Sequence, residues 1–208
     1  MSTKLLQTQI AFFLKKNFGA FESLSLEVKK KLGKEGNSQY LPVPDDAPIE
    51  FPRLTIIYKE QRIVAFKNRI DIFFNGDHDV DILQKIIDII LNIMGLPIER
   101  LGFVKTFFSE LGISELKSLI SKKEVSENPD LKEISVNINI VKNVNGFGCN
   151  NLEKISLGSV TGGKNGVIIL KDCNTMAGNS LSDLDTEKML SLITEMSKEN
   201  TRFFLLLS

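Results

Sequence analysis

The stretch LTIIYKEQRIVAFKNRIDIFFNGDHDVDILQKIIDIILNIMGLPIERLGFVKTFF, residues 54–108, decides the fold class of this chain. Residues 54–59 and 64–74 alternate apolar and polar side chains, which is the period of a half-buried β-strand. Because the two runs are so close in sequence, they predict an antiparallel hairpin. In the second run the alternation predicts a hydrated face with Lys67, Arg69 and Asp71 and a buried face with Val64, Phe66, Ile70, Ile72 and Phe74.

Residues 80–94 follow as a helix that is apolar around most of its circumference. Its polar side chains gather along one narrow stripe, formed by Asp81, Gln84, Lys85, Asp88 and Asn92. Asp77 and Asp79 suit caps at its start, and Gly95 and Pro97 end it. A helix exposed along one stripe packs against a sheet and against something more, either other helices or a second subunit. Residues 101–108 then predict another strand.

Before this stretch, residues 9–18 predict a strand, with a short helix as the alternative, and residues 21–32 predict a helix that Gly33 ends. Residues 41–52 hold four prolines and are either an extended arm over the surface, which we favour, or a domain boundary. The first half therefore reads strand, helix, strand, strand, helix, strand, which is the ferredoxin-like order βαββαβ.

The second half adds a short helix over residues 114–122 and a strand over residues 134–144. Residues 152–160 and 167–173 predict a hairpin around a Gly-rich loop, residues 185–198 an amphipathic helix, and residues 203–207 a closing strand or packed tail. We therefore predict one α+β domain over residues 1–208, with helices on one face of a mostly antiparallel sheet. Its first half would be ferredoxin-like, and its second half a hairpin-rich extension with a C-terminal helix. Two sub-units, 1–122 and 123–208, are the alternative division.

Composition narrows the function classes. Lys and Arg number 26 and so do Asp and Glu, so the chain as a whole does not attract nucleic acid or anionic lipid over long range. A local patch can still do so, and the Lys-rich helix over residues 21–34 is a candidate, although a solvated helix face is the ordinary explanation. The two cysteines and one histidine argue against a disulfide framework or a structural zinc site. Without a signal peptide or a membrane span, we expect a cytoplasmic protein.

Two glycine-rich runs imitate binding motifs. Residues 158–165 fit G-x-x-x-x-G-K, but Asn165 replaces the magnesium-binding hydroxyl and a strand follows where a nucleotide fold needs a helix, so a hairpin loop is the better interpretation. Residues 145–149 share part of the RNA-recognition strand signature but lack its leading base and stacking aromatic, so they indicate a turn.

The densest set of possible ligands is Asp77-His78-Asp79-Val80-Asp81. Carboxylates at alternate positions can bind a hard cation, although the central Gly and downstream Glu of a calcium loop are missing. Helix capping accounts for Asp77 and Asp79 without a metal. His78 is the single histidine and hence the sole source of a histidine base, and at a helix start it is expected to be a solvated residue.

The run Ile98-Glu99-Arg100-Leu101-Gly102-Phe103 resembles a poorly characterised, sporadically distributed bacterial protein family. Its members carry an Arg-aliphatic-Gly-Leu-Arg-Tyr strand after a long helix. Arg100, Leu101 and Gly102 match this motif, whereas Val104 and Lys105 depart from its Arg-Tyr end. The resemblance spans residues 48–108 and implies no activity, because none is established for the family.

Three functions remain in order of preference. The first is a non-enzymatic, cytoplasmic interaction protein, such as an inhibitor, immunity or regulatory factor, that needs no cofactor, binds a protein partner and could form a homodimer. The second is a nucleic-acid-binding protein that uses the ferredoxin-like half and the basic residues Lys29, Lys30, Lys31, Lys67 and Arg69. The third is a metal-dependent hydrolase built on Asp77, Asp79 and Asp81.

Overall fold

A single antiparallel sheet organises the computed structural model, which describes residues 3–33, 36–44, 46–110, 135–160, 164–178 and 181–201. The strand order is β2-β3-β4-β5-β1-β6-β9-β8-β7, and every neighbouring pair is antiparallel. The strands are β1 (Thr3–Leu14), β2 (Asn37–Tyr40), β3 (Leu54–Tyr58), β4 (Gln61–Ala65), β5 (Arg69–Asn75), β6 (Ile98–Ser109), β7 (Ser135–Val144), β8 (Phe147–Val160) and β9 (Lys164–Thr175). The helices are α1 (Phe21–Leu32), α2 (Val80–Asp88) with a π-helical turn at Ile89–Ile93, and α5 (Thr186–Thr201).

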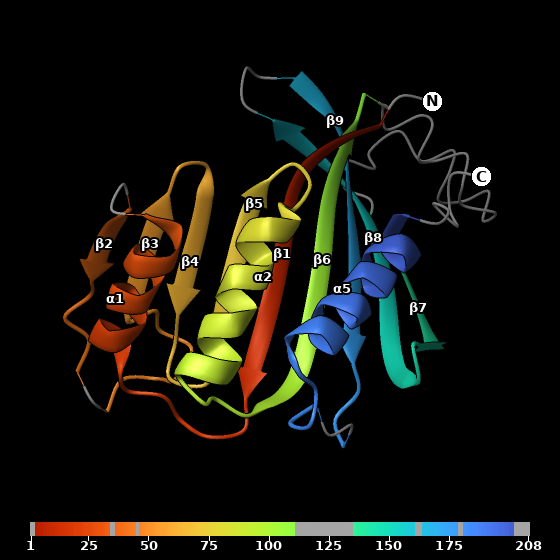
Figure 1. Ribbon diagram of the computed structural model, residues 1–208. Coiled ribbons are helices and arrows are strands. Elements are labelled where there is room, and N and C mark those ends of the chain that lie inside the picture. The colour runs from red at the N-terminus through yellow and green to blue at the C-terminus, as the bar shows by residue number, and fades with distance from the viewer. Residues whose placement is uncertain are drawn as a thin grey trace, which may run out of the picture.

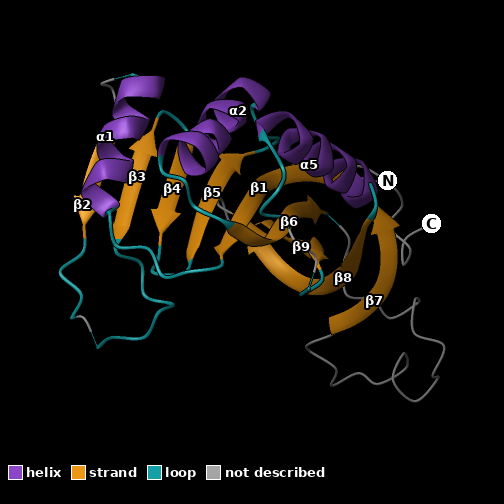
Figure 2. Cartoon of the chain, turned by 60° about the horizontal axis from the view of Figure 1, so that its bottom comes forward, coloured by secondary structure: helices purple, strands orange, loops and turns teal. Residues whose placement is uncertain are grey.

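The three helices lie side by side on one face of the sheet (Figures 1 and 2). The core between the layers joins alternate residues of the central strands, such as Ile10, Phe12 and Phe103, to the inner faces of the helices. Helix α2 lies between α1 and α5 and contacts both. Most of its apolar circumference is therefore covered within the chain, by the sheet and by two helices, while Val80 and Ile93 at its two ends are exposed. The pattern of this helix no longer requires a second subunit.

Helix α2 begins and ends as its sequence predicts. The Asp79 side chain accepts a hydrogen bond from the backbone N–H of Ile82 at 3.0 Å, so the predicted cap is confirmed. After Asp88 the helix widens into the π-helical turn, in which the N–H of Met94 donates to the carbonyl of Ile89 at 2.8 Å. Gly95, with φ of 61°, then ends it in the left-handed region that glycine adopts at low cost.

The predicted strand over residues 64–74 is two strands, and this prediction was wrong in detail. A tight turn, closed by the N–H of Phe66 and the carbonyl of Arg69 at 2.8 Å, separates β4 from β5. The turn reverses the chain and also shifts the alternation. Val64 pairs with Asp71 and lies on the face away from the core, whereas Ile63 and Ile70 point into it. The predicted hairpin with β3 is confirmed, with Leu54 opposite Ala65 and Tyr58 opposite Gln61.

The coarse prediction of a mixed α+β fold with a large, antiparallel sheet is confirmed, but the ferredoxin-like first half is not. That unit has four strands, whereas the first half here has six. There are two additional strands. One is β2, which precedes β3, and the other arises because the turn at Phe66 divides the predicted strand over residues 64–74 into β4 and β5. Within the described part of the chain, no helix is long and apolar enough to cross a membrane.

The second half continues the same sheet through β6 and β9. Asn145 and Gly146, with φ of 51° and 87°, form the two-residue turn between β7 and β8, which confirms the turn interpretation for these two residues, whereas residues 147–149 begin β8. Strands β8 and β9 form the predicted hairpin, with Gly158 opposite Gly166. The helix predicted over residues 114–122 and the strand or tail over 203–207 lie outside the described residues.

The proline-rich arm of residues 41–52 is held to the body by one side chain. Arg53 is buried, and its guanidinium group donates to the carbonyl oxygens of Val43 and Pro44 at 2.7 and 2.8 Å, and to that of Ala47 at 3.3 Å. Prolines lack an N–H and cannot extend the sheet, so these carbonyls fix the arm in place of a strand ladder.

Candidate functional site

The face of the sheet opposite the helices, here called the helix-free face, carries the most distinctive set of side chains. No helix of the described residues lies on it (Figure 2). Its strands β4, β5, β1 and β6 are adjacent, so their outward side chains form rows across the sheet. One row runs Arg62, Phe73, Gln9 and Val104, and a second runs Arg69, Phe13 and Arg100.

Guanidinium groups lie close to phenyl rings along these rows. The Cζ atom of Arg62 lies 4.4 Å from the centroid of the Phe73 ring. Arg100 lies 4.2 Å and Arg69 5.6 Å from the ring of Phe13. Arg69 also lies 4.5 Å from the ring of Phe66 in the β4–β5 turn. Each of these distances is within the range of a cation–π pair.

The central carboxylate of this face, Asp71, is buried between the two rows. It accepts a hydrogen bond from Gln9 at 3.2 Å, and its Oδ1 lies 3.0 Å from the Nε of Arg69. Burial raises the pKa of Asp71 to about 6, against the opposing effects of the Arg69 charge and the Gln9 hydrogen bond. The Arg69 charge and the Gln9 hydrogen bond therefore do not outweigh the loss of hydration. The Arg69 Nε and Asp71 Oδ1 are close, but neither atom forms a hydrogen bond within the described part of the chain.

The charge that this face presents to solvent is positive. The Asp71 side chain is 2% exposed whereas that of its partner Arg69 is 31% exposed, and Arg62 is exposed. The next carboxylate along, Asp172 in β9, is half-buried. Burial raises its pKa, while a hydrogen bond from Asn174 and the charge of Arg100 oppose that rise.

The basic residues predicted from sequence do not form one patch. Lys29, Lys30 and Lys31 lie in the last turn of α1, on the helical side of the sheet. Lys30 contacts Glu27 at 2.5 Å and Lys31 contacts Asp88 at 2.9 Å, so both are used within the helical layer. Arg69 lies on the opposite, helix-free face, and Lys67 in the turn that precedes it. Of the predicted set, only Arg69 belongs to the ring-and-guanidinium rows.

The three aspartates predicted as metal ligands do not form one cluster either. Asp79 caps α2, Asp81 is exposed in its first turn, and Asp77 faces Lys105 at 3.2 Å. In the described part of the chain, no group of three or more His, Cys, Asp or Glu side chains could hold a metal ion. The metal-dependent hydrolase stays a prediction, without support from this arrangement.

His78 differs from the solvated residue that its position suggested. Its side chain is 9% exposed, and its ring meets those of Phe74 and Phe103 edge to face, with centroids 6.4 and 5.6 Å away. Its Nδ1 lies 2.9 Å from Asp77 Oδ1. Burial alone would raise the pKa of Asp77, but its contacts with His78 and Lys105 together hold that pKa below its ordinary value. The cluster closes the turn between β5 and α2.

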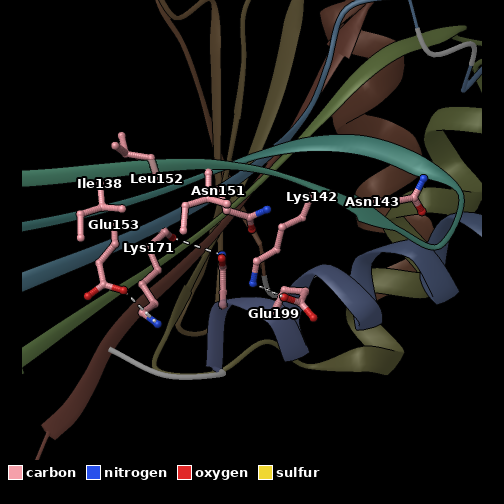
Figure 3. Close-up of a pocket in the computed structure, with 10 residues that line it drawn as sticks. Ile138, Lys142, Asn143, Asn151, Leu152, Glu153, Lys171 and Glu199 are labelled. Carbon is pink, nitrogen blue, oxygen red and sulfur yellow. Dashed lines mark hydrogen bonds and ion pairs between the residues drawn. The ribbon is translucent and has the colours of Figure 1, made fainter. Parts of the chain in front are cut away.

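A cavity of about 250 Å³ lies where α5 meets β7, β8 and β9 (Figure 3). Two ion pairs cross it, Lys171 with Glu153 at 3.3 Å and Lys142 with Glu199 at 3.0 Å. Burial lowers the pKa of Lys171, and the Glu153 carboxylate opposes that effect. Asn200 of α5 donates to the carbonyls of Phe103 and Lys171 at 2.7 and 3.2 Å, which ties the helix to the sheet.

The chemistry available in this cavity is limited. Its described lining residues offer lysine, carboxylate, amide and aliphatic groups, and among them is no hydroxyl, thiol or imidazole that could act as a nucleophile with a partnered base. Each lysine faces a carboxylate. These features fit a polar junction between helix and sheet, and the helix-free face remains the stronger candidate site.

Comparisons with known proteins give no further information on this candidate site. No protein-family model matches the chain, and no curated protein matches it. Among solved structures, it is similar to the rolling circle replication initiator protein from Geobacillus stearothermophilus, with a TM-score of 0.31 and 9% sequence identity over 95% of this chain and 80% of that one. A likeness of this degree assigns neither a shared fold nor a function.

Proposed function

We propose that this protein is a non-enzymatic interaction protein that binds a macromolecular partner through its helix-free face. The observation that carries the proposal is the pair of rows in which Arg62, Arg69 and Arg100 alternate with Phe13 and Phe73. Arginine and aromatic side chains are the residues most enriched at binding hot spots, because they combine a large contact area with directed hydrogen bonding.

The helical side of the molecule has fewer features that suit a binding partner. Most of its apolar side chains pack into the core, those that remain exposed, Leu26, Val80 and Ile93, lie without an arginine–ring contact among the described residues, and its exposed lysines Lys30 and Lys31 face carboxylates of the same chain. Exposed pairs of that kind contribute little to recognition. The helix-free face, in contrast, combines half-buried rings with one exposed arginine, Arg62, and two half-buried ones, Arg69 and Arg100.

Affinity capture from host extract tests the proposal when the bound species are compared between two matched variants. Arg62→Ser/Phe73→Leu alters the helix-free face, and Lys30→Ser/Lys31→Ser removes charge from the helical side. We expect the wild-type protein and the helical-side variant to retain the same partner. The face variant should bind that partner at least ten-fold more weakly, a loss of about 1.4 kcal/mol or more. Equal retention by the face variant would show that the partner binds elsewhere.

A further inference from the structure

The helix-free face points to a particular class of ligand, and this inference rests on the function proposed above. We infer that it is a platform for single-stranded nucleic acid, with bases stacking on the Phe13 and Phe73 rows and phosphates meeting the arginines. Three features support this inference: phenyl rings and guanidinium groups in contact on one face, the sign of the exposed charge, and exposed lysines at one end of the face.

The stacked groups fit bases. A phenyl ring or a guanidinium plane that lies against a sheet presents a flat surface to an unpaired base. The contacts of Arg62 with Phe73 and of Arg100 with Phe13, at 4.4 and 4.2 Å, create two such positions. They are displaced along the strands, because Phe13 is opposite Arg69 and that residue is four positions from Phe73 in β5. Four residues of strand span about 13 Å, so one extended strand of nucleic acid can reach both positions.

The charge fits a polyanion. Guanidinium groups reach solvent on this face while the Asp71 carboxylate is buried beside one of them. At the end of the face near Phe13, two further exposed cations, Lys15 and Lys16, follow β1. The backbone N–H groups of Leu14 and Lys15 donate to the carbonyls of Asn68 and Pro97 at 2.8 and 2.9 Å, which brings the loops of three strands together there.

These features favour a single strand over other anionic partners. A duplex keeps its bases stacked internally and cannot use the rings, so only its phosphates would contact this face. An acidic protein would need the positive charge but would not need phenyl rings beside the guanidinium groups. The sequence motif at residues 145–149 plays no part, since it forms the turn between β7 and β8 and the first residues of β8, where Cys149 is buried.

Fluorescence anisotropy with a labelled oligo(dT) of about 15 nucleotides, a length within the site sizes of single-strand-binding folds, tests the inference on the full chain. We expect binding that weakens between about 50 and 200 mM salt, and weaker binding of the matched duplex. Phe73→Leu keeps apolar bulk but removes the ring, and should weaken single-strand binding roughly 5- to 100-fold. Arg62→Ser alters an exposed side chain and should weaken binding and reduce the salt dependence by about one phosphate contact.

Lys30→Ser provides the matched control, because it removes an exposed cation from the opposite side of the molecule. Its affinity should equal that of wild type. The inference is overturned if oligo(dT) does not bind at low salt, if duplex or poly-glutamate binds as tightly, or if Phe73→Leu and Lys30→Ser have equal effects. A different outcome separates the two proposals. If oligo(dT) does not bind but Arg62→Ser/Phe73→Leu still abolishes capture of the host partner, the inferred ligand class is wrong and the proposed function stands. A thermal melt confirms that each variant is folded.

Discussion

Asp71 shows how one residue links the stability of the fold to the candidate site. Its pKa is raised from 3.8 to about 6 by burial. Between about pH 4 and 6 the folded chain therefore keeps a proton that the unfolded chain has released. The free energy of unfolding contributed by this group is greatest below pH 4, falls by roughly 3 kcal/mol as the pH rises through that window, and is constant above it.

Asp71→Asn should remove this dependence, since the amide cannot ionise. We expect the variant to be more stable than wild type at pH 7, and the difference between the two to shrink as the pH falls to 4. Urea denaturation of both proteins at several pH values measures that difference, in which the titration of all other groups cancels. A difference that does not change with pH would contradict the prediction.

For single residues, the sequence predicts roles that depend on neighbouring positions in the chain, and it does not predict contacts between residues on different strands. The cap at Asp79 and the turn at Asn145-Gly146 follow from local backbone chemistry, and both are confirmed. Phe13, Phe73 and Arg100 come together only through strand register, and nothing in their local sequence marks them. One signal was present: Gln9, Ala11 and Phe13 are two positions apart and therefore share a face, which is the face opposite to that of the buried Ile10 and Phe12.

Among the elements, α2 illustrates what a hydrophobic pattern predicts and what it leaves open. The pattern predicted a helix exposed along one stripe, and α2 with its π-helical turn covers the predicted span. It did not reveal that α1 and α5 supply the cover, because that depends on how distant segments pack. The β4–β5 turn was missed for a related reason. Apolar residues continue on both sides of Lys67 and Asn68, so the alternation alone does not show where the chain reverses.

The start of α2 offers a test at this scale, with two aspartates two positions apart. Asp79→Ala removes the cap and should lower the free energy of unfolding by about 1 kcal/mol. Asp81→Ala changes an exposed carboxylate in the first turn and should cost less than half of that, from the helix dipole alone. Urea denaturation at pH 7 compares the two. Equal losses would mean that the capping hydrogen bond contributes nothing beyond charge.

For the whole molecule, the layered arrangement explains why function was harder to predict than fold class. All three described helices cover one face of the sheet, and the residues with the strongest patterns, in α2 and the central strands, build the core between them. The side chains named on the helix-free face run in sequence from Gln9 to Asp172, at alternate positions of strands that are far apart along the chain. They share a surface only after the sheet has formed.

The strand β7 has a further consequence for how copies of this chain meet. In the described part of the sheet it is the outermost strand on its side, it is ten residues long, and its Val141 side chain is 61% exposed. An outer strand leaves every second amide and carbonyl without a ladder partner, and one this long with so few charges is a template for a strand of another molecule. We expect light scattering to show association that grows with protein concentration, and Val141→Lys to suppress it. Two sheets joined in this way would make one continuous surface, so the reach of the molecule along a bound polymer would then depend on how concentrated it is.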